Sequence, residues 1–216
     1  MRIIERPLCK ICNIRKPRRY CPGVIGDICS ICCGTEREVT VRCPFECPYL
    51  QEARRHEQPP TADPETFPNK DIRISEQFLY ENETLLLMTG SALLKAVLET
   101  AGATDSDVRE ALDAIVRTQR TRQSGLYYDT RPSNPIAASI QELAQENLEE
   151  ARKQMAAQSG SAHIRDSDLL GIVVFLQRMA IQHNNGRPLG RAFIDFLREF
   201  YPHEDKRASS SPLIVT

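Results

Sequence analysis

The sequence predicts a mainly α-helical protein in two parts, a small cysteine-rich module followed by an all-α bundle of about five helices. All eight cysteines lie between positions 9 and 47. From about position 76, apolar residues recur at the spacing of amphipathic helices. The expected boundaries are 1–57 for the module, 58–72 for a Pro-rich linker, 73–202 for the bundle and 203–216 for a disordered tail.

The cysteines occur at spacings that are typical of structural zinc sites. Their order is Cys9-x2-Cys12-x8-Cys21-x7-Cys29-x2-Cys32-Cys33-x9-Cys43-x3-Cys47. A structural zinc ion takes four Cys or His ligands in a tetrahedron, and a C-x2-C turn aims two sulfurs at one ion. Eight cysteines therefore predict two Zn²⁺ ions in two filled sites.

The preferred assignment of ligands is interleaved. The first set is Cys9, Cys12, Cys29 and Cys32, and the second set is Cys21, Cys33, Cys43 and Cys47, with an exchange of Cys32 and Cys33 left open. A segment this short cannot bury an adequate apolar core, so metal binding has to supply folding free energy. Filled four-thiolate sites have no open coordination position, which argues against a catalytic zinc.

Outside the cysteines, the sequence of the module predicts a short hairpin and a short helix. The alternating segment Arg37–Arg42 predicts a strand of a short hairpin, and Pro48 predicts the start of a short polar helix that runs to His56. His56 is expected on the surface of that helix rather than as a ninth ligand. A small apolar centre is expected from Tyr20, Val24, Ile25, Ile28, Val39 and Val41.

Disulfides and iron–sulfur clusters, the other common uses of clustered cysteines, fit this sequence less well than zinc sites do. The N-terminus lacks the apolar stretch of a secretory signal, so a cytoplasmic location is expected and disulfides are disfavoured. The dense cysteine runs typical of iron–sulfur proteins are absent from the sequence. No apolar run approaches the ~20 residues that span a bilayer, so no membrane association is expected. A zinc site that also serves as a redox switch stays open.

Charge is distributed unevenly along the chain. Residues 1–55 contain 11 Lys and Arg against 6 Asp and Glu, a net charge of +5, whereas the remainder carries −6. A basic segment indicates nucleic acid binding, with Arg15, Lys16, Arg18, Arg19, Arg54 and Arg55 as the candidate contacts. Two zinc ions with eight thiolates contribute roughly −4, however, because metals bind thiolates rather than thiols. The arginines near the cysteines, Arg18, Arg19, Arg37 and Arg42, are thus expected to balance sulfur charge.

The first two bundle helices are marked by apolar spacing and by a cap. The first is expected from about Glu76, with its apolar positions at Leu86, Leu93, Leu94 and Val97. The second begins at Thr104, which is a plausible N-cap, with Asp107 three positions later as in a capping box.

The remaining three helices follow with clear boundaries. The third begins at Pro135, which suits the first helical position. The fourth runs from about Ser167 to the stop signal at 183–186 and is apolar on every side, which places it in the middle of the bundle. The fifth carries the apolar residues Phe193, Ile194, Phe196, Leu197 and Phe200.

Four runs around the cysteines carry a resemblance. Residues 18–22 (RRYCP), 28–34 (ICSICCG), 37–44 (REVTVRCP) and 47–50 (CPYL) resemble the start of an uncharacterised group of bacterial cysteine-rich proteins, over about the first 50 residues. The short sequences around Cys21 and Cys29 are also remotely similar to those of HIT-type and B-box zinc fingers. That similarity implies a cross-braced, treble-clef-like module with two zinc ions that binds proteins. The HIT pattern has a further cysteine soon after Cys21, where Gly23 and Val24 stand here, and the histidines of both patterns are missing.

The sequence predicts a non-enzymatic protein. It contains no Gly-rich phosphate loop, nucleophile elbow or H-E-x-x-H motif. We therefore expect a zinc-binding adapter that engages a protein partner, with a nucleic-acid-binding regulator and a thiol/zinc redox sensor as alternatives. The loop that contains Tyr127 and Tyr128 is expected to pack onto the bundle, although tyrosines in loops also serve as binding residues. The sequence indicates neither the partner nor an oligomeric state.

Overall fold

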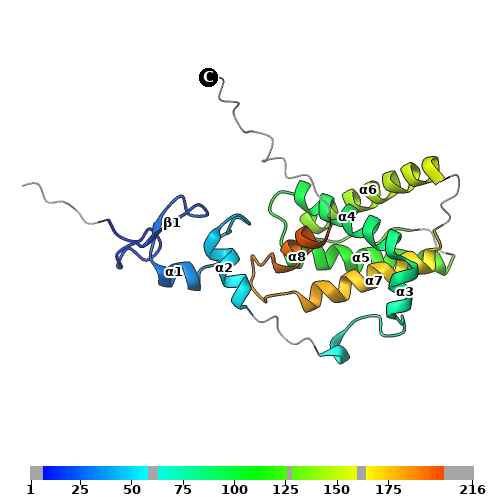
Figure 1. Cartoon of the computed structure of the whole chain (residues 1–216), viewed down its shortest axis with the longest axis horizontal. Coiled ribbons are helices and arrows are strands. Elements are labelled where there is room, and N and C mark those ends of the chain that lie inside the picture. The colour runs from blue at the N-terminus through cyan, green and yellow to red at the C-terminus, as the bar shows by residue number, and fades with distance from the viewer. Residues whose placement is uncertain (1–6, 58–62, 126–127, 160–163, 202–216) are drawn as a thin grey trace, which may run out of the picture.

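The structure is a computed structural model that describes residues 7–57, 63–125, 128–159 and 164–201. Within these ranges it contains eight α-helices, a short 3-10 helix and a two-stranded sheet, so the protein is mainly helical as expected. Figure 1 shows the module at one end of the molecule and the helical part at the other. The helix that follows the last cysteine, α2 (Pro48–His56), is the last element of the module and lies on the side that faces the helical part.

The hairpin of the module is not where the sequence predicts it. Strands β1 (Arg19–Cys21) and β2 (Gly26–Ile28) pair antiparallel, with Arg19 opposite Ile28, and lead into helix α1 (Ser30–Thr35). The strand expected over 37–42 is instead a tight reversal, in which the Glu38 N–H donates to the Val41 carbonyl at 3.0 Å and Glu38 has a φ of +52°. A left-handed residue cannot continue a strand, so alternation alone gave the wrong prediction.

The apolar centre of the module is smaller than expected. Ile28, Val41 and Leu50 are buried among the cysteines, with Val24 partly buried. The side chains of Tyr20, Ile25 and Val39, which were expected inside, are exposed. Sulfur atoms therefore fill much of the space that an apolar core occupies in a larger domain.

The described residues of the helical part form six α-helices. They are α3 (Glu76–Glu81), α4 (Glu83–Glu99), α5 (Asp105–Gln123), α6 (Pro135–Ser159), α7 (Asp166–Gln182) and α8 (Ala192–Phe200). The first expected helix is divided in two at Asn82, whose backbone leaves the helical region. Thr104 and Asp107 form the expected capping box of α5. Helix α6 begins at Pro135 as expected.

Helix α7 lies in the interior of this bundle, as its apolar sequence predicts. It packs against α5 and α4, while α6 packs against the same two helices from another side. Its buried apolar residues belong to one continuous core with those of the other helices, and they include Leu169, Leu170, Ile172, Val173, Val174 and Leu176. None of the helices in the described part of the chain is both long and apolar enough to cross a bilayer.

The Pro-rich segment expected as a linker is described from residue 63 onward, and its second half is bound to the bundle. The Asn69 side chain accepts hydrogen bonds from Arg120 at 2.8 and 3.1 Å and donates to Gln177 at 2.8 Å. Arg178 donates to the carbonyls of Asn69 and Ile72. Residues 69–72 therefore lie along α5 and α7, and this part of the chain is fixed to the bundle by side chains of both helices.

Candidate metal centre

The four cysteines of the first set come together in the structure. The sulfurs of Cys9, Cys12, Cys29 and Cys32 all lie within 4.8 Å of one another. Bonds of about 2.3 Å from a tetrahedral zinc ion place its sulfur ligands about 3.8 Å apart, so this spacing suits a metal ion. The structure thus forms a possible metal site from the four residues that the sequence assigns to one ion.

Local backbone geometry aims these sulfurs inward. The loop from Cys9 closes on itself through the Cys9 N–H, which donates to the Arg15 carbonyl at 2.8 Å, and turns at Asn13, which has a φ of +51°. At the start of α1, Cys29 is the N-cap, and its sulfur accepts a hydrogen bond from the Cys32 N–H at 3.4 Å. The Cys29 N–H in turn donates to the Cys9 sulfur at 3.2 Å, which joins the two halves of the site.

The thiols of the first set differ widely in acidity. Burial raises the pKa of Cys9, but backbone N–H donors lower it by more, so that it falls to about 6. The N–H groups of Arg15 and Ile14 lower the pKa of Cys12. Burial, and after it the neighbouring sulfurs, raise the pKa of Cys32 to about 12. Negative charges this close repel one another, so full ionisation of all four thiols requires a cation among them.

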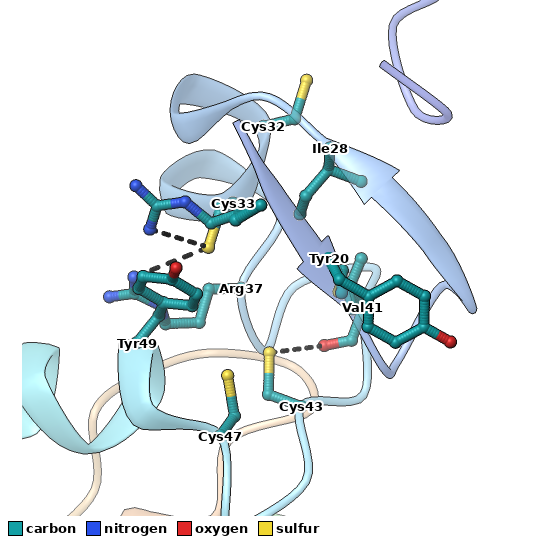
Figure 2. Close-up of a pocket in the computed structure, with 11 residues that line it drawn as sticks. Tyr20, Ile28, Cys32, Cys33, Arg37, Val41, Cys43, Cys47 and Tyr49 are labelled. Carbon is teal, nitrogen blue, oxygen red and sulfur yellow. Dashed lines mark hydrogen bonds between the residues drawn. The ribbon is translucent and has the colours of Figure 1, made fainter. Parts of the chain in front are cut away.

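The second set shares one cavity but is less tightly gathered. Cys21, Cys33, Cys43 and Cys47 all line a cavity of about 10 Å³, which is the room that about one water molecule needs. Figure 2 shows the sulfurs of Cys43 and Cys47 near each other on one side of it, and that of Cys33 across from them. Among the described residues, the first set is the one group whose ligand atoms meet the 4.8 Å spacing. Metal binding by the second set therefore stays a prediction.

Cys32 and Cys33 point to different sides of α1. The sulfur of Cys32 belongs to the first cluster, and Figure 2 shows it directed away from Cys33, Cys43 and Cys47. Consecutive residues of a helix are about 100° apart around its axis, so two adjacent cysteines cannot face the same ion equally well. The geometry agrees with the preferred assignment of Cys32 to the first set.

Two arginines approach the sulfur of Cys33. The Arg19 Nη1 atom lies 3.8 Å from it. The Arg37 Nη2 atom lies 4.0 Å from it, and Figure 2 shows Arg37 beside Cys33. The Arg19 guanidinium also stacks on the Tyr49 ring, 3.9 Å from its centroid. Two of the four arginines expected near the cysteines, Arg19 and Arg37, therefore contact a sulfur of the second set. Arg42 does not: its Nη1 donates instead to the Gly102 carbonyl of the helical part at 2.7 Å.

Other candidate residues have different roles. His56 contacts Glu52 at 3.0 Å on the surface of α2. Of the six cations considered for nucleic acid, Arg54 is largely buried in ion pairs with Glu38 and Asp195, whereas Arg15, Lys16 and Arg18 are exposed. Tyr127 lies outside the described residues, and the side chain of its neighbour Tyr128 is 60% exposed.

Glu38, which no sequence pattern marks, joins the two parts of the chain. Glu38 is completely buried, and its carboxylate is held by Arg54, Asn185 and the Arg191 N–H. A buried carboxylate requires such partners, since an unpaired one is costly. No local pattern marks it, because all of its side-chain partners are at least 16 positions away in sequence.

The chain was compared with protein-family models, with curated proteins and with solved structures, and none of these comparisons gave a match.

Proposed function

We propose that the protein is a non-enzymatic zinc-binding adapter whose module holds one Zn²⁺ ion in each cysteine set. The observation that carries this proposal is the cluster of four sulfurs within 4.8 Å in the first set. An all-sulfur tetrahedron favours zinc or an iron–sulfur centre over oxygen-preferring ions. Cysteine pairs from separated segments are the usual ligand pattern of a structural zinc site, and a reducing, cytoplasmic environment would keep the thiols available.

The second ion is supported by the surroundings of its four cysteines. Three of them, Cys21, Cys43 and Cys47, are buried side chains at the edge of one small cavity. Burial raises the pKa of Cys43, and negative charge on Cys47 and Cys21 raises it further, so these sulfurs interact electrostatically. A divalent cation in the cavity would remove that repulsion. With four thiolates on each ion, neither has a free position for substrate, which supports a structural role.

Protein binding is supported by the exposed surface of the module. It carries five exposed large apolar side chains in the segment that contains β1, β2 and α1, which are Leu8, Ile14, Tyr20, Ile25 and Ile31. Exposed apolar groups held on a rigid frame are typical of protein-binding surfaces. Metal ligation at Cys9, Cys12 and Cys29 would supply that rigidity, because the same loops carry both the ligands and the apolar residues.

Metal analysis tests the first half of this proposal. Full-length protein purified without chelator is expected to contain about two zinc ions per chain and no iron, by elemental analysis together with native mass spectrometry. Chelation is expected to remove both and to increase amide exchange in residues 7–57. A chain that contains iron, or no metal at all, would contradict zinc binding.

Affinity capture tests the second half. The intact chain, an Ile14→Ser/Ile25→Ser variant and a Tyr80→Ser control are compared as baits in the native host. Tyr80 suits as a control because it is 77% exposed and lies on α3, in the helical part. A partner that the control retains and the double variant loses supports the module as the binding surface. Equal recovery by all three baits would contradict it.

A thiol redox sensor is the second candidate, favoured by the arginines at Cys33. This sulfur is only partly buried, so an oxidant can reach it, and two guanidinium groups lie 3.8 and 4.0 Å from it. Redox-sensor cysteines are typically accessible and lie in electropositive surroundings of this kind. Mild peroxide is then expected to release one of the two zinc ions before the other, whereas a purely structural pair of sites would lose both together.

A further inference from the structure

The segment between Cys33 and Cys43 is bound to the helical part by backbone and side-chain hydrogen bonds. The Leu189 N–H donates to the Glu38 carbonyl at 2.8 Å, and Arg187 donates to the Arg37 carbonyl at 2.9 Å. Both donors lie in the connection between α7 and α8. Because Arg37 also contacts the Cys33 sulfur, one residue touches both a cysteine of the second set and the helical part.

The Glu38 carboxylate is the centre of this contact. Its two oxygens accept from Arg54 at 2.8 Å, from Asn185 at 2.8 Å and from the Arg191 N–H at 3.1 Å. Arg54 also forms an ion pair with Asp195 of α8. The carboxylate has no exposure to solvent. Arg54 belongs to α2 of the module, whereas Asn185 and the Arg191 N–H belong to the α7–α8 connection, so two of the three donors to this buried charge are present only while the module is seated.

A second part of the contact involves Cys43, which is itself a candidate metal ligand. The Arg191 guanidinium donates to the Cys43 carbonyl and lies 3.9 Å from the centroid of the Phe45 ring. Arg42, adjacent to Cys43, donates to the Gly102 carbonyl between α4 and α5. The backbone that presents Cys43 to the cavity is therefore positioned by the helical part.

We infer that metal binding at the second set and seating of the module on α7–α8 are linked, so that each strengthens the other. This inference rests on the proposed metal ion at Cys21, Cys33, Cys43 and Cys47. An ion fixes the ends of segment 33–47, which presents Glu38 to its partners. The seated helical part in turn holds Cys43 in place. Coupling of two equilibria is reciprocal, so the same factor acts in both directions.

The linkage controls access to a surface of the molecule. A cleft of about 740 Å³ lies between α2 and α8, lined on one side by Gln51 and Arg55 and on the other by His183, Phe196 and Glu199. Its two walls belong to the two parts of the chain. The cleft is therefore formed in the seated state, and release of the ion from the second set is expected to lower the population of that state by the coupling factor.

Chelator competition on the full-length protein tests one direction of the linkage. Glu38→Gln is compared with Glu52→Gln, an exposed ion-paired glutamate within α2. In Glu38→Gln the affinity for the second ion is expected to fall about tenfold or more, within the usual range of coupling. The affinity of Glu38→Gln for the first ion reports on folding of the module and is expected to stay within about twofold of wild type. In Glu52→Gln, the affinities for both ions are expected to stay within about twofold of wild type.

Amide exchange by NMR tests the other direction. The N–H groups of Leu189 and Arg191 donate to Glu38, whereas those of Phe193 and Ile194 donate to Asp105 within the helical part. In a Cys33→Ser variant that retains its first ion, the first pair is expected to exchange about tenfold faster or more, and the second pair at the wild-type rate.

The outcomes separate this inference from the proposed function. Two ions per chain with equal affinities in Glu38→Gln and wild type would overturn the linkage and leave the zinc sites intact. Unchanged exchange at Leu189 and Arg191 in Cys33→Ser would do the same. A wild-type chain that binds a single ion would overturn both the second site and the linkage.

Discussion

The carboxylate of Glu38 accepts a hydrogen bond at 2.8 Å from the side-chain amide of Asn185, 147 positions further along the chain. Glu38 lies between two cysteines of the module and Asn185 in the turn that follows α7. The pair shows that the cysteine-rich segment is packed against the bundle through charged and polar side chains as well as joined to it through the chain. The segment between Cys33 and Cys43, two candidate metal ligands, therefore also takes part in the packing of the module against the helices.

The division of ligands between the two metal sites is expected to appear in double variants. Cys9→Ser combined with Cys32→Ser removes two ligands from one site, so the chain is expected to keep about one zinc ion. Cys9→Ser combined with Cys33→Ser damages both sites and is expected to leave no tightly bound ion. Cobalt substitution and native mass spectrometry measure this difference. The reverse pattern would assign Cys33, rather than Cys32, to the first set.

Asp105 is expected to titrate near pH 6 in the folded protein. Burial raises the pKa of this carboxyl to about 6, although the N–H groups of Phe193 and Ile194 lower it and the charges of Glu38 and Arg54 oppose each other. The unfolded value is about 3.9, so between about pH 4 and pH 6 the folded state holds a proton that the unfolded state has lost. Asp105 therefore makes the protein less stable as the pH rises through this window, and adds no further change above it.

Two measurements check this expectation. The ¹³C chemical shift of the Asp105 carboxyl should have its midpoint near pH 6. The free energy of unfolding in urea is measured for wild type and for Asp105→Asn at each pH. As the pH rises through the window, the wild type should lose up to about 3 kcal/mol of stability relative to the variant. The paired comparison removes the pH dependence of metal binding, which both proteins share. A midpoint below pH 4 would refute the expectation.

Gly90→Ala is expected to destabilise the bundle. A Cβ atom at this position of α4 would lie 2.1 Å from the Tyr201 ring, which is buried, so the ring or the helix has to move. Overpacking of this kind typically costs about 1–3 kcal/mol. Urea unfolding followed by the helical circular dichroism signal measures it.

Gly34→Ala is the matched control for this substitution. A Cβ atom at Gly34 of α1 would meet nothing within 4 Å, so alanine is expected to be neutral or to stabilise by up to about 1 kcal/mol through its helix propensity. Equal effects of the two substitutions would contradict the close contact between Gly90 and Tyr201.

Nucleic acid binding by the module is expected to be weak and only mildly salt-dependent. Arg54 is engaged by Glu38 and Asp195, and Arg19 by Cys33 and Tyr49. The remaining exposed cations can reach few phosphates, and each phosphate contact contributes roughly 0.9 to the slope of log K against log salt. Fluorescence anisotropy with a labelled duplex over a range of salt concentrations measures the slope. A slope steeper than about −4 that is lost in Arg15→Gln/Lys16→Gln/Arg18→Gln would restore the nucleic-acid hypothesis.

The sequence alone determined the elements whose signals are local. The Thr104 cap, Pro135 at a helix start and the apolar α7 are each specified by a few neighbouring residues, and the structure confirms them. The grouping of Cys9, Cys12, Cys29 and Cys32 also followed from spacing, because two short turns each present a pair of sulfurs.

Only the tertiary structure decided the role of residues whose partners are distant. Arg37–Arg42 has the alternation of a strand, yet the chain reverses at Glu38, where a buried carboxylate gathers donors from α2 and from the α7–α8 connection. Arg54 resembled a cation available to nucleic acid and is an ion-pair partner of that carboxylate. Long-range pairing of buried charges depends on how the two parts pack together, and no short stretch of sequence encodes that packing.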